Sequence, residues 1–85
     1  MEKLYNIYRN CKAEQGNEIV ILVRGYGRYY LFDNDATKAH KATGLLCVHL
    51  NIDDKDVKMT LFNHSELDTY LPKLIRAGYR VAICG

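Results

Sequence analysis

The sequence predicts an α+β fold in which three helices pack on a mixed β-sheet, with the elements in the order α-β-β-α-β-β-α-β. Three segments carry apolar residues at the spacing of one helix face, and glycines follow their ends. Four further segments are either continuously apolar or alternate apolar with polar residues, as strands do, and the aromatic content of residues 28–32 favours a fifth strand. Whether the domain is α+β or α/β depends on how the strands pair, which these patterns leave open.

The helix predicted over residues 3–14 has one apolar stripe at positions i, i+3, i+4 and i+7. The stripe consists of Leu4, Ile7, Tyr8 and Cys11, and Gly16 is the stop. The continuous β-branched run over 19–23 is typical of a strand buried on both faces, so we expect it to be central in the sheet. A glycine on each side of Tyr26 permits a tight reversal into a second strand over 28–32, which predicts a β-hairpin.

The second helix is predicted to follow a run of N-cap residue types. The run consists of Asp33, Asn34 and Asp35, the helical positions are Ala36, Ala39, His40 and Thr43, and Gly44 is the stop. Alternation of apolar and polar residues then predicts two half-buried strands, over 46–52 and 57–62. The apolar positions of the first of these are Leu46, Val48, Leu50 and Ile52.

The third helix has the clearest apolar stripe, between Leu67 and Ile75. Ser65 and Asp68 form a capping-box variant ahead of it. Because an interior proline removes a backbone hydrogen bond, Pro72 predicts either a kink or a start delayed to Thr69. A glycine ends the helix, and the alternating segment 79–84 is the last predicted strand.

Length and composition indicate one domain over residues 1–85, since 48% of the residues are hydrophobic and 26% are charged. The longest apolar run, 19–23, is far shorter than the roughly 18 residues that span a bilayer. The first residues lack the apolar core of a secretory signal, so a cytoplasmic location is expected. An odd number of cysteines without a C-x-x-C pair predicts free thiols at Cys11, Cys47 and Cys84.

Catalytic and ligand-binding motifs are not found in the sequence. Neither G-x-x-x-x-G-K-[ST] nor G-x-G-x-x-G occurs, and the histidines lack metal-site spacing. The acidic run 53–56 lacks EF-hand spacing and is expected to be a solvated turn. A noncatalytic protein without a cofactor or metal is therefore expected. The enzymatic alternative is an acid-base pair of His64 with a neighbouring tyrosine, which requires a cleft around that histidine.

The segment 24–30 is the candidate binding site because arginines, tyrosines and glycines meet there at a strand reversal. The predicted contact residues are Arg24, Tyr26, Arg28, Tyr29 and Tyr30. Guanidinium groups and aromatic rings stack on bases, and arginines also neutralise phosphates. The formal net charge of +2 permits nucleic-acid contact without requiring it. The alternative is a structural hairpin whose tyrosines cover the edge of the core.

Two blocks of the sequence resemble domain I of the MutS-type DNA mismatch-repair proteins, and the similarity runs along nearly the whole chain. The family has an apolar strand ending in Arg and then G-D-F-Y-E-L-F-x-D-D-A, which residues 19–24 and 29–36 match in part. It later has P-Y-H-x-x-x-x-Y-L-x-x-L followed by G-x-x-V-A-I-C-E-Q, which residues 64–74 and 78–84 match in part. The resemblance implies the fold of domain I and contact with DNA near a mismatch.

The sequence departs from the family at the Phe-x-Glu motif, whose Phe wedges beside the mispaired base and whose Glu hydrogen-bonds it. Arg28 occupies the Phe position and Tyr30 the Glu position; with one gap, Tyr29 replaces the Phe. The resemblance therefore implies a DNA-binding module with altered or lost mismatch specificity.

The expected partners are DNA, bound weakly by the isolated domain, and other mismatch-repair domains or a further protein; no membrane contact is expected. The alternative is a protein-interaction module that has kept the fold and lost DNA binding. Composition does not separate the two, because tyrosine and arginine are also enriched at protein interfaces.

Overall fold

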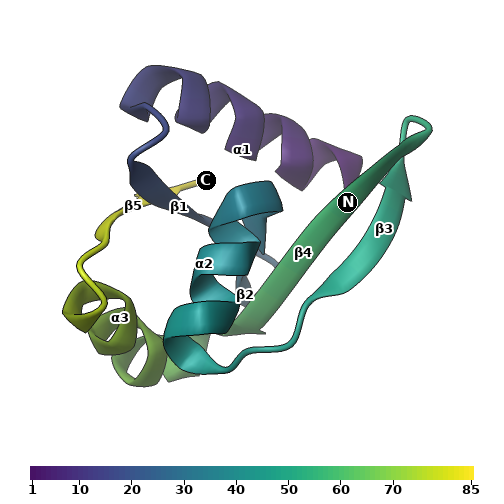
Figure 1. The fold of residues 1–85 in the computed structure, drawn as a ribbon. Coiled ribbons are helices and arrows are strands. Elements are labelled where there is room, and N and C mark those ends of the chain that lie inside the picture. The colour runs from purple at the N-terminus through teal and green to yellow at the C-terminus, as the bar shows by residue number, and fades with distance from the viewer.

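The computed structural model describes residues 1–85 and contains three α-helices, five strands and one short 3-10 helix (Figure 1). In chain order these are α1 (Glu2–Gln15), β1 (Ile19–Gly25), β2 (Arg28–Phe32), α2 (Asp33–Thr43), β3 (Val48–Ile52), β4 (Lys55–Asn63), η1 (His64–Glu66), α3 (Leu67–Arg76) and β5 (Arg80–Cys84). The predicted α+β class and element order are confirmed. None of the helices is long and apolar enough to cross a membrane.

The five strands form one mixed sheet in the order β3-β4-β2-β1-β5. Strand β5 runs parallel to β1, and the other three pairings are antiparallel. The predicted hairpin is confirmed, because β1 and β2 pair antiparallel across a two-residue loop. Strand β1 is internal, as its apolar run predicts, but the middle position of the sheet belongs to β2.

Helices cover both faces of the sheet, with α1 on one side and α2 and α3 on the other (Figure 1). Successive side chains of a strand point to opposite faces. Ile21 and Val23 therefore lie in the core under α1, and Val20 and Leu22 in the core under α2 and α3. This arrangement explains the continuous apolar sequence of β1.

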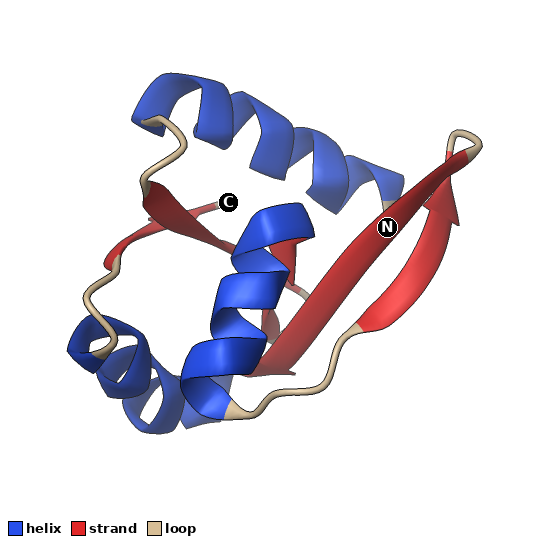
Figure 2. Ribbon diagram, in the orientation of Figure 1, coloured by secondary structure: helices blue, strands red, loops and turns tan.

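Strand β3 differs from its expected half-burial. Leu46 precedes the strand and is 80% exposed, and Val48 is also exposed; of the apolar set, only Ile52 is buried. Figure 2 shows β3 as the outermost strand, and it pairs with β4 alone. The alternation correctly predicted a strand but not the burial of its apolar face.

The two later helices begin differently from the predictions. No side chain caps α2: Phe32 holds the N-cap position, and Asp33 and Asp35 lie in the first turn. The capping box before α3 is formed by Asn63 and Glu66, whose Oε1 accepts from the Asn63 N–H at 2.9 Å. The predictions of a Ser65–Asp68 box and of a start at Thr69 were therefore wrong. The proline is accommodated inside α3.

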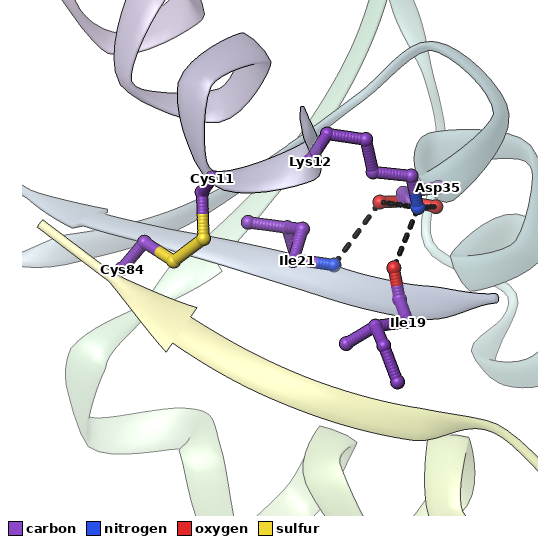
Figure 3. The surroundings of a disulfide bond; sticks show 6 residues. All are labelled: Cys11, Lys12, Ile19, Ile21, Asp35 and Cys84. Carbon is purple, nitrogen blue, oxygen red and sulfur yellow. Dashed lines mark hydrogen bonds and ion pairs between the residues drawn. A yellow bond between two sulfur atoms is a disulfide. The ribbon is translucent and has the colours of Figure 1, made fainter. Parts of the chain in front are cut away.

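Cys11 and Cys84 form a disulfide, so the prediction of free thiols was wrong for these two residues (Figure 3). The parallel pairing of β5 with β1 brings Cys84 opposite Val23, under the helix that carries Cys11. The two cysteines are 73 positions apart in the sequence, and only the fold brings them together. Cys47 is a free thiol, as predicted.

Candidate nucleic-acid interface

The tip of the β1–β2 hairpin is a tight turn formed by Tyr26 and Gly27, between the paired residues Gly25 and Arg28. Tyr26 has φ 52° and Gly27 has φ 73°. Positive φ at both positions is typical of a type I′ turn, whose twist matches that of the flanking strands. Gly, Asn and Asp are the usual residues there, whereas a tyrosine in the left-handed region costs on the order of 1 kcal/mol.

Tyr26 is 78% exposed, so its ring contributes little to the core. Burial of the side chain therefore does not offset the conformational free energy that the positive φ costs at this residue. Strained residues that add nothing to packing are concentrated at ligand-contact sites. The contact role of Tyr26 stays a prediction, which its conformation and exposure favour.

Arg24 and Arg28 flank the turn, are exposed, and take part in no salt bridge. Because side chains alternate along a strand, Arg24 lies on the face of Leu22 and Arg28 on the opposite face, that of Tyr30. The hairpin tip therefore carries an aromatic ring at its apex and one uncompensated positive charge on each side.

Tyr29 and Tyr30 do not belong to this exposed surface, which corrects the stacking role expected for them. Tyr29 is 2% exposed and lies in the core under α2 and α3; Tyr30 is 3% exposed and lies under α1. Both rings pack against other rings, Tyr29 against Phe62 and Tyr30 against Phe32. For these two residues the structural alternative holds, because tyrosines of the hairpin do complete the core.

The start of η1 lies beside the turn. Asn63, the last residue of β4, pairs with Arg28, and the His64 N–H donates to the Gly27 carbonyl oxygen at 2.9 Å. Neither residue is among the contact residues predicted from the sequence. Their position depends on the pairing of β4 with β2, which joins segments far apart in the chain and leaves no local signal.

A buried ion pair ties α1 and α2 to β1 (Figure 3). The Lys12 Nζ lies 2.9 Å from Asp35 Oδ1 and 3.0 Å from Oδ2, and it also donates to the Ile19 carbonyl oxygen. The Ile21 N–H donates to Asp35 Oδ2 at 3.0 Å. The carboxylate is completely buried, and its contacts with Lys12 and the Ile21 N–H join α1, α2 and β1.

The largest pocket, about 660 Å³, lies between α1 and the start of α2, away from the hairpin tip. Within it the Tyr5 hydroxyl donates to Asp33 Oδ2 at 2.8 Å. Burial and this hydrogen bond raise the pKa of Tyr5, and burial followed by the nearby charges of Asp35 and Asp33 raises the pKa of Tyr8. Raised phenol pKa values keep both hydroxyls protonated and unsuited to act as bases.

His64 lines neither of the two pockets, so the structure shows no cleft around the residue that the enzymatic alternative requires. The three histidines also lie on separate elements, in α2, β3 and η1. No group of three or more His, Cys, Asp or Glu side chains is arranged to hold a metal ion.

Comparison with known proteins identifies the family. The family model described as MutS domain I matches residues 2–85. Three proteins named DNA mismatch repair protein MutS are similar: that of Salinibacter ruber is 42% identical over 72 residues, that of Bacteroides fragilis 47% over 68, and that of Rhodopirellula baltica 38% over 88. These alignments cover 84%, 79% and 99% of this chain, but only 8%, 8% and 9% of the relatives. The chain belongs to the MutS domain I family.

Proposed function

We propose that this chain is a noncatalytic DNA-binding module that contacts DNA through the tip of the β1–β2 hairpin, with altered or lost mismatch specificity. The observation that carries the proposal is the exposed, strained Tyr26 between two arginines that lack a carboxylate partner. Membership of the MutS domain I family supports DNA as the partner.

The hairpin tip approaches DNA with its apex first. Arg24 and Arg28, on opposite faces of the hairpin, neutralise phosphates on the two sides of the contacted step. Tyr26 stacks on a base or wedges against it, at an unstacking cost that is lowest where base pairing is already weak. Binding therefore favours mismatched or single-stranded DNA over a fully paired duplex.

We expect altered specificity because residues other than Phe and Glu occupy the two positions of the Phe-x-Glu motif. The resemblance aligns the wedge Phe with Arg28 and the base-reading Glu with Tyr30. The Tyr30 side chain is buried under α1, so this position offers no carboxylate to a base. The module discriminates by ease of unstacking rather than by a hydrogen bond to the mispaired base.

Fluorescence anisotropy at low salt tests the proposal, with labelled paired, mismatched and single-stranded oligonucleotides. At low salt we expect dissociation constants on the order of 10⁻⁶ to 10⁻⁵ M, and an affinity about tenfold weaker after Arg28→Glu. Arg80→Glu is the matched control, because Arg80 pairs with Ile19 at the opposite end of β1. It makes the same charge change away from the tip and is expected to have a smaller effect.

The absence of binding to all three oligonucleotides at tens of micromolar would overturn the proposal and favour the protein-interaction module. Equal losses for the Arg28 and Arg80 variants would show that net charge, rather than the hairpin tip, determines binding.

A further inference from the structure

His64 is the exposed end of a row of aromatic rings that leads out of the core under α2 and α3. Its imidazole stacks on Tyr29, with ring centroids 5.2 Å apart and an interplanar angle of 20°. Tyr29 in turn contacts Phe62 at 5.4 Å, and Phe62 contacts Tyr70 at 5.0 Å. Of the four rings, His64 alone is exposed.

The imidazole is held next to the hairpin tip from two directions. One face of the imidazole lies against the buried Tyr29 ring. The backbone N–H of His64 donates to the Gly27 carbonyl oxygen at 2.9 Å. The ring is therefore oriented before any ligand arrives, which reduces the conformational entropy lost on binding. Its neighbour Asn63 pairs with Arg28, so the histidine shares one end of the sheet with the proposed DNA contacts.

We propose that His64 is a stacking platform for an unpaired nucleobase, with Tyr29 as its internal support. This inference rests on the proposed DNA-binding function and extends that surface from the hairpin tip to the start of η1. The base adds one more ring to the row that ends at His64. Histidine is among the aromatic side chains on which splayed-out bases stack.

The surroundings favour a base over a phosphate as the group that His64 contacts. The carboxylate of Glu66 lies in the same short helix and accepts from the Asn63 N–H, so negative charge is already present near the imidazole. The two arginines supply positive charge elsewhere on the surface, at the tip. The histidine instead offers an aromatic face whose position is fixed by a second ring.

Two substitutions at this position separate stacking from charge. His64→Leu keeps an apolar cover over Tyr29 but removes the aromatic face, whereas His64→Phe keeps the face and removes the titratable nitrogen atoms. His49→Leu is the matched control, because His49 is an exposed histidine on the edge strand β3. Melting curves of each variant establish that it is folded.

The probes are a single-stranded oligonucleotide, a duplex with one bulged 2-aminopurine, and the fully paired duplex. We expect His64→Leu to weaken binding of the first two about fivefold while leaving the paired duplex within twofold. His64→Phe and His49→Leu are expected to bind like the unaltered protein. The slope of log affinity against log salt should not change for His64→Leu, because no phosphate contact is lost. Quenching of 2-aminopurine fluorescence should be lost in His64→Leu alone.

Unaltered binding by His64→Leu would overturn the inference, and so would an equal loss in His64→Phe, which would indicate a charge contact. If either of these outcomes is found while Arg28→Glu still weakens binding, the proposed function stands and only the stacking role of His64 fails. Failure of the unaltered protein to bind any of the probes would instead overturn the proposed function, and this inference with it.

Discussion

Replacing Lys12 by methionine is predicted to destabilise the fold strongly, because it leaves the buried Asp35 carboxylate without its close cation. The carboxylate is completely buried, and the only other cation near it is Lys38, whose Nζ lies 4.0 Å away. Removing one partner of a buried ion pair costs about 3–5 kcal/mol. The Ile21 N–H remains as a donor, so we expect the lower end of that range, about 3 kcal/mol.

This loss is large compared with the total stability of such a domain. A chain of 85 residues has a free energy of unfolding on the order of 4–13 kcal/mol. For a small domain with a urea m-value of about 1 kcal/mol/M, a loss of about 3 kcal/mol lowers the urea midpoint by about 3 M. Urea titrations followed by far-ultraviolet circular dichroism measure this directly.

Two further variants test the physical reason for the loss. Lys12→Met combined with Asp35→Asn is expected to recover part of the stability, because the amide oxygen still accepts from the Ile21 N–H and no buried charge is left unpaired. His49→Ala breaks the exposed pair with Asp56 and is expected to cost less than about 0.5 kcal/mol. A Lys12→Met variant within 1 kcal/mol of the unaltered protein would refute the reasoning, since the carboxylate would then not be desolvated as the structure describes.

Three other outcomes are expected. Reduction of the Cys11–Cys84 disulfide should lower the free energy of unfolding by up to about 4 kcal/mol, because the bond joins positions 73 residues apart. Thermal melts with and without dithiothreitol measure this loss, and identical melts would contradict the expectation. Tyr26→Asn should raise the free energy of unfolding by about 1 kcal/mol, because asparagine suits the type I′ turn, and should weaken DNA binding, because asparagine has no ring. A loss of stability in urea titrations would argue against backbone strain at Tyr26. Stability should fall above a pH of about 10, because burial raises the pKa of Tyr8 in the fold and the unfolded chain there loses a phenol proton that the folded chain keeps. Tyr8→Phe should make the fall of unfolding free energy with pH shallower, and an unchanged slope would assign the fall to other groups.

The sequence predicted the elements of the fold better than their pairing. Helices and strands follow from local periodicity, which correctly located all three α-helices and all five strands. The parallel contact of β5 with β1 and the antiparallel contact of β4 with β2 join segments distant in the chain, so no local pattern reports them. The Cys11–Cys84 disulfide depends on the first of these contacts, and the position of His64 on the second.

The candidate site remains a prediction as a segment, and two of its five residues lie in the core rather than at the surface. Composition identified residues 24–30, but it does not distinguish the exposed Tyr26 from the buried Tyr29 and Tyr30. A continuous apolar run indicates a strand buried on both faces, and the same reasoning applies to Tyr29 through Phe32. The hydroxyl groups make these tyrosines resemble surface residues, although their rings complete both cores.

The depth of burial along the hairpin supports the binding role proposed for its tip. Val23 and Tyr29 are buried on opposite faces, although only two residues separate Val23 from the turn and only Arg28 separates the turn from Tyr29. The proposed contact side chains therefore sit on strands fixed by two cores, and the proposed binding of DNA would cost them little backbone entropy. The same rigidity holds Tyr26 in an unfavourable φ region, because the register of the two strands leaves the turn only two residues. The strain at the apex and the rigidity of its support thus have one structural cause, and substitutions at the tip should separate affinity from stability.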